Sequence, residues 1–401
     1  MPVFLDEIPE LAPKIKRPDT RRWLGLLVIL LATGTVLAFS FWSTEREGAI
    51  FWFTALGVPF CVWGTLLGIR RTAYKADQVW AESWNADRSI LWNDEIVRGQ
   101  RAAWVITSGV ITQVGSSTDK LLTAVRTSLP VLQVQKTRSG AGPVRHSKLK
   151  GFEAESKVGE FNASIKTLIM QVMPALEKIP GNIPCWLIAD FDIPLTLDAE
   201  QSALDIISSE TGRSFSLFTA KGFTAFDYWL DNAWLKPSLL LCLSAVIRDT
   251  PQEGDGEAIS LTLMLNRKHP GFPDAIQLHR PEKHHNGSLA KTLSRALLWS
   301  KLSPEKVQGS WVAGRKISQG GEWNTACEEH KLSVEMTEDH KNIDDYIGQV
   351  GISSPWLAVA LAAPSARSGM PQIIAVETSE NELWIAGVTS GDYTGKPQDA
   401  L

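Results

Sequence analysis

Three histidines lie close together in the segment LHRPEKHHNG, at His279, His284 and His285. Imidazole nitrogens bind zinc and other transition metals, so this segment is the first candidate for a metal site. Adjacent histidines do not converge on one ion in a helix, however, and Pro281 and Gly287 indicate a loop. The spacing therefore favours a solvated loop, and we predict neither a metal nor a cofactor.

Carboxylates are grouped in a second segment, at Asp249, Glu253, Asp255 and Glu257. Such a group could bind Ca²⁺, but it lacks the calcium loop that ends in a bidentate glutamate. Gly254 and Gly256 can adopt positive φ at little cost. We therefore expect a tight turn here.

Phosphate binding is a third candidate chemistry, because Gly320 and Gly321 precede a predicted helix. Backbone amides at a helix start cradle phosphate in nucleotide-binding loops. The chain has neither GxxxxGK[ST] nor GxGxxG after a strand, and Lys316 and Ser318 do not complete either pattern. The sequence motifs of serine hydrolases, zinc proteases and kinases are missing as well.

The remaining candidate nucleophiles are four cysteines: Cys61, Cys185, Cys242 and Cys327. They lie in apolar or helical contexts without CxxC spacing. This pattern is typical of reduced, buried thiols in a cytoplasmic protein and not of a disulfide framework. We therefore assign no catalytic, cofactor or metal residue from these motifs.

Composition bounds the class of protein. Apolar residues make up 44% and charged residues 21% of the 401 residues, which is typical of a chain with a packed core. The 40 basic and 44 acidic side chains give a formal net charge of -4. No strongly basic surface is implied, so we expect no nucleic acid partner.

Two uncharged apolar stretches near the N-terminus, Trp23–Trp42 and Ala49–Ile69, predict a membrane hairpin. As helices, both are long enough to cross a hydrocarbon core of roughly 30 Å. Only the polar link Ser43–Gly48 separates them, so both outer ends lie on one side. Pro59 would kink the second helix, which a membrane span tolerates. The alternatives are a cleaved signal peptide and a buried hairpin in a soluble protein, and two spans in series disfavour both.

Basic residues flank the hairpin on its outer ends: Lys14, Lys16, Arg17, Arg21 and Arg22 before it, and Arg70, Arg71 and Lys75 after it. Positively charged flanks stay in the cytoplasm. We therefore predict a two-pass protein of a bacterial inner membrane, with both termini cytoplasmic and membrane lipid as a partner.

The chain divides by pattern into six parts: a cytoplasmic tail (1–22), the hairpin (23–71), a juxtamembrane helix and strand-rich segment (72–150), two α/β halves (151–267 and 268–390) and a C-terminal tail (391–401). Tyr74–Arg98 is predicted as a helix, packed on the domain or lying on the membrane, and Ala102–Val114 as strand. Lys136–Lys150 is a basic segment, which indicates a solvated loop or a contact with anionic lipid or an acidic partner.

Within the two halves an order of elements recurs, which predicts a duplicated α/β domain. The first half has helices at 161–178, 198–210 and 226–247 and strands at 185–191 and 258–265. The second half has helices at 288–299, 321–331 and 344–362 and strands at 307–313, 372–377 and 382–388. The two matching stretches open with Asp227-Tyr228 and Asp345-Tyr346, and each has a proline, Pro237 or Pro355, just before its predicted apolar helix.

This arrangement resembles the thiolase/β-ketoacyl-synthase fold, which consists of two related α/β halves. The segment Ser288–Gly314 (SLAKTLSRALLWSKLSPEKVQGSWVAG) is similar to the ketosynthase helix that leads to the strand before a catalytic His-Gly-Thr. Gln252–Arg267 (QEGDGEAISLTLMLNR) is similar to the family's GEGAGALVLER strand entry. The resemblance implies a thiolase-like fold over roughly residues 160–390.

The family's catalytic residues have no counterpart at the positions that the resemblance implies. The family's nucleophile is a cysteine at a helix N-terminus, whereas Cys185 is expected at a strand start and Cys242 inside an apolar helix. The family's histidines would fall near Gly314-Arg315 and near Gly351-Ile352. A Claisen condensation needs the thiolate and the histidines. The resemblance therefore implies a catalytically silent member.

Two functions follow as hypotheses. The first is a non-enzymatic scaffold or adaptor, because the hairpin and the silent domain together are similar to accessory membrane proteins of bacterial type VI secretion systems. A homodimer is compatible with this hypothesis. Its protein partner would then be a secretion effector or spike protein. The alternative is a membrane-bound enzyme of acyl or lipid metabolism, with a pocket lined by Cys327, Glu328 or a loop histidine.

Overall fold

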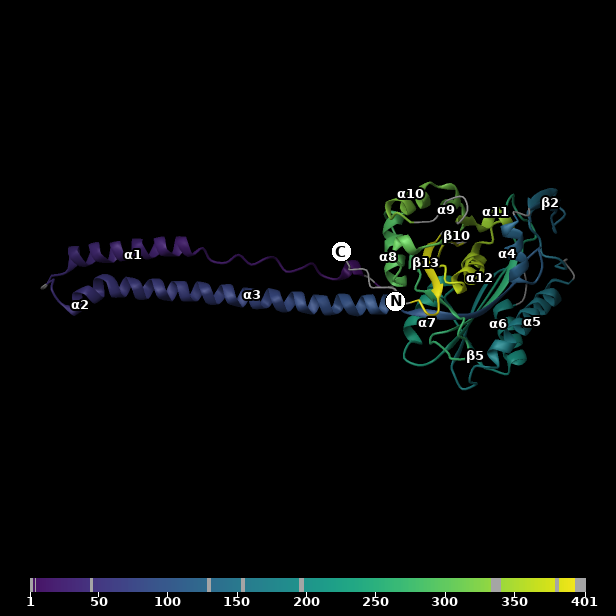
Figure 1. Cartoon of the computed structure of the whole chain (residues 1–401), viewed down its shortest axis with the longest axis horizontal. Helices are drawn as coiled ribbons and strands as arrows, with labels where there is room; N and C mark the ends of the chain where they lie inside the picture. The colour runs from purple at the N-terminus through teal and green to yellow at the C-terminus, as the bar shows by residue number, and fades with distance from the viewer. Residues whose placement is uncertain are drawn as a thin grey trace. The chain divides into compact units, whose positions relative to one another are not determined.

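The computed structural model describes residues 3, 5–43, 46–127, 131–152, 156–194, 198–332, 340–378 and 382–393. The chain divides into two compact units: a helical unit of Phe4–Glu95, and a sheet unit of Met1–Val3 and Ile96–Leu401. Figure 1 shows long helices in the first unit, and strands with surrounding helices in the second. Of the predicted C-terminal tail, residues 394–401 lie outside the described part of the chain.

The helical unit contains the two predicted apolar helices. Its elements are η1 (Leu5–Glu7), α1 (Thr20–Phe41), α2 (Ala49–Trp52), the π-helical turn η2 (Phe53–Gly57) and α3 (Val58–Gly99), which runs on into the sheet unit. The helices Thr20–Phe41 and Ala49–Gly99 are long and apolar enough to cross a membrane, by length and composition. The prediction of two apolar helices is thus confirmed.

Pro59 explains the local geometry of the second helix. The π-helical turn of η2 ends two residues before it, because a proline ring excludes the usual bond to the carbonyl four residues earlier, here Ala55. Gly34 of α1 faces this point: a Cβ at Gly34 would stand 2.6 Å from Ala55 O and 2.3 Å from Pro59 Cγ. Glycine therefore permits the close approach of the two helices.

The sheet unit is built on one large mixed sheet. Its strands are β1 (Ala102–Ile111), β4 (Cys185–Asp192), β5 (Phe215–Leu217), β6 (Leu239–Val246), β7 (Ala258–Leu265), β8 (Ile276–His279), β9 (Glu282–Lys283), β10 (Gly309–Ala313), β11 (His340–Asn342), β12 (Gln372–Glu377) and β13 (Leu383–Ser390). A separate hairpin pairs β2 (Gln133–Lys136) with β3 (Pro143–His146).

Helices connect these strands. They are α4 (Thr118–Arg126), α5 (Lys157–Leu176), α6 (Ala199–Thr211), α7 (Gly222–Asn232), α8 (Leu289–Ser300), η3 (Pro304–Lys306), α9 (Arg315–Gln319), α10 (Glu322–Glu329), α11 (Ile343–Ile347), η4 (Gly351–Ser353) and α12 (Ser354–Arg367).

The strand order shows the duplication directly. One half of the sheet reads β5-β4-β6-β7-β1 and the other reads β11-β10-β12-β13-β8. Within each half the strands can be numbered from one to five along the chain, with β9 left out. In both halves they then lie side by side in the order 3-2-4-5-1. The directions also agree: the first three strands of each row run parallel, and each of the last two is antiparallel to its predecessor. β1 and β8 pair antiparallel at the seam between the halves.

Alternating side chains divide the core into layers. In β6, Leu240 and Cys242 join the apolar cluster that contains α7 and α12, whereas Leu239 and Leu241 face the cluster of α5 and α6. In β12, Ile374 joins the same central cluster, and its neighbours face α8 and α10. Strand alternation produces this two-sided burial. The fold is therefore mixed α/β with α7 and α12 packed between the two halves, and the predicted fold class is confirmed.

Two predicted helices are wrong. The stretch predicted as a helix over Phe226–Ile247 is the helix α7 followed by the strand β6. Pro237 disfavours a continuous helix, and the eight fully buried residues of β6 pair on both edges, as a central strand does. The second stretch, Asp344–Ala362, contains the short helices α11 and η4 before α12. The two stretches therefore do not match element for element.

The basic segment Lys136–Lys150 contains the turn and second strand of a hairpin, and one of its cations is buried. Arg138 is 3% exposed at its side chain and forms an ion pair with Glu257. The guanidinium therefore serves an internal contact and not a solvated loop or an external partner.

Candidate functional site

A group of convergent polar side chains lines a cavity of roughly 520 Å³ at the carboxyl ends of parallel strands. Four segments supply its wall: Arg248, Thr250, Gln252 and Asp255 after β6; Gly314, Arg315 and Lys316 after β10; Asp344, Gln349, Gly351 and Ser354 around α11 and η4; and Glu377 and Thr378 at the end of β12. Ligands of open α/β sheets bind at such strand ends. We call this cavity the strand-end cavity.

Asp344 is the most perturbed acid of the strand-end cavity. It lies in the first turn of α11, and its Oδ2 accepts the backbone N–H of Gly314 at 2.8 Å. Its Oδ1 is buried and has no hydrogen-bond partner within the described residues. Burial raises the pKa of Asp344 to about 6, and the nearby carboxylates of Asp345 and Glu377 add to this rise. A carboxyl with this pKa exchanges protons near neutral pH, as general acids and bases do.

A glycine is required next to this acid. Gly314 follows β10 with φ of +109°, and a Cβ there would stand 2.2 Å from Cβ of Glu377. Glu377 in turn accepts the backbone N–H of Lys316 at 3.0 Å. The Lys316 ammonium lies 3.6 Å from the same carboxylate. Backbone and charge therefore hold β10 and β12 together at the cavity wall.

Arg248 supplies a cation from the opposite segment. Its guanidinium lies 3.7 Å from Asp255 and 3.6 Å from Asp192. Its Nε is buried without a hydrogen-bond partner among the described atoms. The backbone N–H of Arg248 donates to Glu257 at 3.0 Å. Arg248 is thus held both through its main chain and through its side chain.

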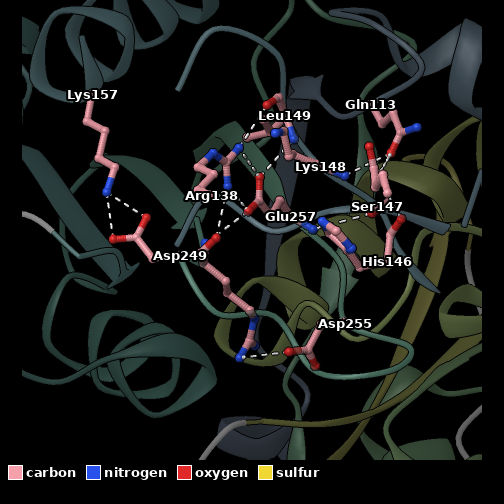
Figure 2. A network of polar contacts seen from close by, with 12 residues as sticks. Gln113, Arg138, His146, Ser147, Lys148, Leu149, Lys157, Asp249, Asp255 and Glu257 are labelled. Carbon is pink, nitrogen blue, oxygen red and sulfur yellow. Dashed lines mark hydrogen bonds and ion pairs between the residues drawn. The ribbon is translucent and has the colours of Figure 1, made fainter. Parts of the chain in front are cut away.

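Figure 2 shows the polar network around Arg138 and Glu257. Glu257 is 1% exposed at its side chain, pairs with Arg138, and accepts the backbone N–H of Leu149 at 2.8 Å. Arg138 also donates to the backbone carbonyls of Arg248 and Leu149 at 3.0 Å and 2.8 Å. This network joins the β2–β3 segment to the β6–β7 turn, and so fixes one wall of the strand-end cavity.

A second, smaller cavity of roughly 400 Å³ surrounds the start of α7 and shares Thr378 with the first. Gly222 begins α7 with φ of +53°, and its N–H donates to the two carboxylate oxygens of Asp190 at 3.0 Å and 3.1 Å. The Trp356 indole N–H donates to the same carboxylate at 2.7 Å. Burial raises the pKa of Asp190 to about 6, against the lowering effect of these two donors.

The three histidines do not form one site. His279 is the last residue of β8 and is buried; its Nε2 contacts Thr389 Oγ1 at 2.9 Å, and burial lowers its pKa to about 3. His284 contacts Thr292 Oγ1 at 3.0 Å, and His285 is exposed. The predicted loop thus holds only the last two. Within the described residues, no group of three or more His, Cys, Asp or Glu side chains is placed to hold a metal.

The cysteines lie away from both cavities. Cys185 begins β4, Cys242 lies in the middle of β6 and not in a helix, and Cys327 lies in α10; these three are buried, whereas Cys61 in α3 is exposed. Burial raises the pKa of each of the three buried thiols, in Cys327 to about 12. Neither Cys327 nor Glu328 lines the strand-end cavity, whereas Gly314, Arg315 and Gly351 do.

Sequence reasoning did not find Asp190, Asp344, Glu377 or Arg248. Asp190, Glu377 and Arg248 lie at or just beyond the ends of buried strands, where a charged residue interrupts or follows an apolar run. Their positions at strand ends could have indicated a site, because the carboxyl ends of the parallel strands in an α/β sheet meet at one edge, where ligands bind. The sequence does not single out Asp344 in this way. It stands beside a second aspartate, Asp345, which is exposed in the structure, and the sequence does not indicate which of the two faces the cavity.

No family model and no curated protein matches the sequence. Solved structures do match. The ketosynthase from module 1 of the bacillaene synthase of Bacillus amyloliquefaciens FZB42 matches with a TM-score of 0.54 and 8% identity, over 76% of this chain and 75% of that one. The module 6 ketosynthase of the Bacillus subtilis 168 bacillaene synthase matches with a TM-score of 0.54 and 9% identity, over 73% and 71%.

A type II polyketide ketosynthase matches as well, with a TM-score of 0.52 and 13% identity over 72% of this chain and 99% of that chain. It was solved in complex with an acyl-carrier protein and bound to a hexaketide. At these identities the likeness shows the fold, which is the thiolase-like ketosynthase type expected from the sequence.

These matches correct the predicted function. The matching structures described above are ketosynthases of polyketide biosynthesis, so the interpretation as a non-enzymatic type VI secretion scaffold is wrong. The prediction that the protein is not an enzyme is contradicted by the same matches. The alternative hypothesis, an acyl or lipid enzyme on a diverged thiolase-like fold, agrees better with them.

Proposed function

We propose that the protein is a membrane-anchored enzyme that binds an acyl thioester in the strand-end cavity and removes a proton from it, with Asp344 as the base. The observation that carries the proposal is Asp344 itself, which lines that cavity and has a buried Oδ1 without a hydrogen-bond partner among the described residues. The ketosynthase-like fold supports an acyl thioester as the substrate class, because ketosynthase chemistry forms the enolate of one.

The charges around the cavity suit this reaction. Above about pH 6 the Asp344 carboxylate is ionised and can accept the α-proton of the acyl group. The resulting enolate oxygen is an anion, and Arg315 and Lys316 are exposed cations on the same wall. Cations aimed at a developing negative charge lower the barrier to its formation. The proton returns from solvent, so the proposed step needs no cysteine.

The membrane anchor is the second part of the proposal. The two apolar helices cross the inner membrane of a bacterium, and the basic residues on both flanks keep the two termini in the cytoplasm. The sheet unit then meets cytoplasmic acyl thioesters, carried on coenzyme A or on an acyl-carrier protein. The predicted boundaries at residues 151 and 268 and the predicted homodimer remain proposals.

Deuterium exchange tests the proposed reaction. The full chain, in detergent or nanodiscs, is incubated in D₂O with acyl-coenzyme A and acyl-carrier-protein thioesters, and mass spectrometry follows exchange at the α-carbon. We expect Asp344→Asn to lower the exchange rate roughly 10²- to 10⁴-fold. The matched control is Asp345→Asn, which removes the exposed neighbouring carboxylate and should change the rate far less, only through its influence on the pKa of Asp344. No exchange with any thioester, or equal rates in wild type and Asp344→Asn, would refute the proposed reaction.

A further inference from the structure

The helical unit contains a third cavity that the proposed reaction does not use. It encloses roughly 570 Å³ between the start of α1 and the middle of α3. Its walls are Arg17, Pro18, Thr20, Trp23, Leu24, Trp63, Leu67, Arg71, Tyr74, Lys75 and Gln78. Three cations and three aromatic rings thus surround one cavity inside one unit.

The aromatic side of the cavity is held together by a hydrogen bond. Trp63 Nε1 donates to the backbone carbonyl of Trp23 at 2.7 Å, which joins the two helices at this level. Indole and phenol rings prefer the boundary between hydrocarbon and water. Trp23, Trp63 and Tyr74 therefore place the cavity at the headgroup level of a bilayer that the two helices cross.

The cationic side is open to a ligand. Lys75 Nζ donates to Gln78 Oε1 at 3.1 Å. Within the part of the chain that the structure describes, neither Arg17 nor Arg71 forms an ion pair. Arg17 precedes the first apolar stretch and Arg71 follows the second, so the cavity brings together positive charges from both flanks of the hairpin. Cations without an acidic partner next to a hydrocarbon boundary attract an anion.

We propose that this cavity binds the phosphodiester headgroup of an anionic phospholipid. Guanidinium groups bind phosphate oxygens through paired hydrogen bonds, and Arg17 and Arg71 approach from two sides. The apolar walls at Leu24 and Leu67 offer contact to the first carbons of the acyl chains. The inference rests on the membrane part of the proposed function and is independent of the reaction at Asp344.

Reconstitution into nanodiscs of equal parts phosphatidylcholine and phosphatidylglycerol tests the site. The lipids that stay bound to the released full chain are counted by native mass spectrometry. We expect phosphatidylglycerol to be enriched, and Arg71→Gln and Arg17→Gln each to lower the enrichment about fivefold, since one cation near the surface is worth roughly 1 kcal/mol. The matched control is Arg70→Gln, which removes the same charge one residue away, outside the cavity.

Each other outcome has a definite meaning. An equal loss in Arg70→Gln would show attraction to bulk surface charge and overturn the site. If inorganic phosphate binds in an Arg71-dependent way and no phosphatidylglycerol is retained, the ligand is a free anion, and the lipid proposal is overturned. Insertion into pure phosphatidylcholine without enrichment from the mixture would overturn the site alone. Failure of the chain to float with vesicles of any composition would overturn the membrane proposal itself.

Discussion

Asp190 of β4 accepts the backbone N–H of Gly222 at the start of α7, at 3.0 Å and 3.1 Å to its two oxygens. A negative charge at a helix N-terminus is favourable because the helix dipole and its free amides point there. Asp190 is fully buried, however, and burial favours its protonated form. The buried carboxyl group at the start of α7 is therefore half protonated at about pH 6.

This balance predicts a pH dependence of stability. The pKa of Asp190 is raised from 3.8 to about 6 in the folded chain, so the folded state binds the proton more strongly than the unfolded state. Its contribution is fully present below about pH 4 and is lost as the pH rises through about 6, by up to roughly 3 kcal/mol. Denaturant unfolding of the full chain at several pH values measures this slope.

Asp190→Asn should remove that part of the slope, since asparagine does not titrate. Asp192→Asn is the matched control, because Asp192 ends the same strand and its side chain is 51% exposed. An unchanged slope in Asp190→Asn would mean that Asp190 keeps an ordinary pKa in the folded chain.

Glu257→Gln should destabilise the sheet unit strongly. The substitution leaves the Arg138 guanidinium buried without its counter-charge, and breaking a buried ion pair in this way costs about 3–5 kcal/mol. Glu210→Gln breaks the surface pair with Lys166, whose side chains are 39% and 52% exposed, and should change the unfolding free energy by at most about 1 kcal/mol. Chemical denaturation of both variants compares the two effects. Equal effects would show that the network of Figure 2 does not support the fold.

The buried thiols should resist alkylation in the folded protein. Burial raises the pKa of Cys327 to about 12, so only about one thiol in ten thousand is ionised at pH 8. Iodoacetamide labelling followed by peptide mass spectrometry should find Cys185, Cys242 and Cys327 unmodified until denaturant is added. Rapid labelling of any of the three in the native protein would identify a reactive thiol and revive a thiolate mechanism.

Gly34→Leu should weaken the helical unit. The new side chain would collide with Pro59 and with the carbonyl of Ala55, and the forced separation of the helices costs about 1–3 kcal/mol or more. Gly25→Leu is the control on the same helix, because a Cβ there meets nothing within 4 Å. Thermal unfolding in detergent should separate the two variants, and equal melting temperatures would argue against close packing at Gly34.

The elements with a single strong pattern could be predicted from the sequence. The strand Ala258–Leu265 has the predicted bounds, and α6 and α8 differ from prediction by one residue at each end, because capping residues Asp198 and Ser288 mark their starts. The run after Pro237 could not be assigned in the same way. A continuous apolar stretch fits a buried helix and a central strand equally, and only its pairing with β4 and β7 decides.

The candidate site was beyond sequence reasoning for a different reason. Gly314, Asp344 and Glu377 come from three segments that meet only when β10 and β12 lie side by side and α11 packs beside them. The spacing of these residues along the sequence does not indicate that they lie close together in the fold. The resemblance implied a site near Gly314 and Gly351, but it implied histidines and a cysteine that the chain lacks there and did not indicate the acids that are present.

The position of β1 affects how the protein responds to mechanical force. Helix α3 ends at Gly99 and β1 begins at Ala102, so tension on the helix reaches the sheet unit through β1. This strand is paired on both edges, with β7 and with β8. A pull along such a strand loads many hydrogen bonds at once in shear, whereas a pull on an edge hairpin opens them one after another. Helix α3 is thus joined to a strand that leaves the sheet only when the ladders on both of its edges break.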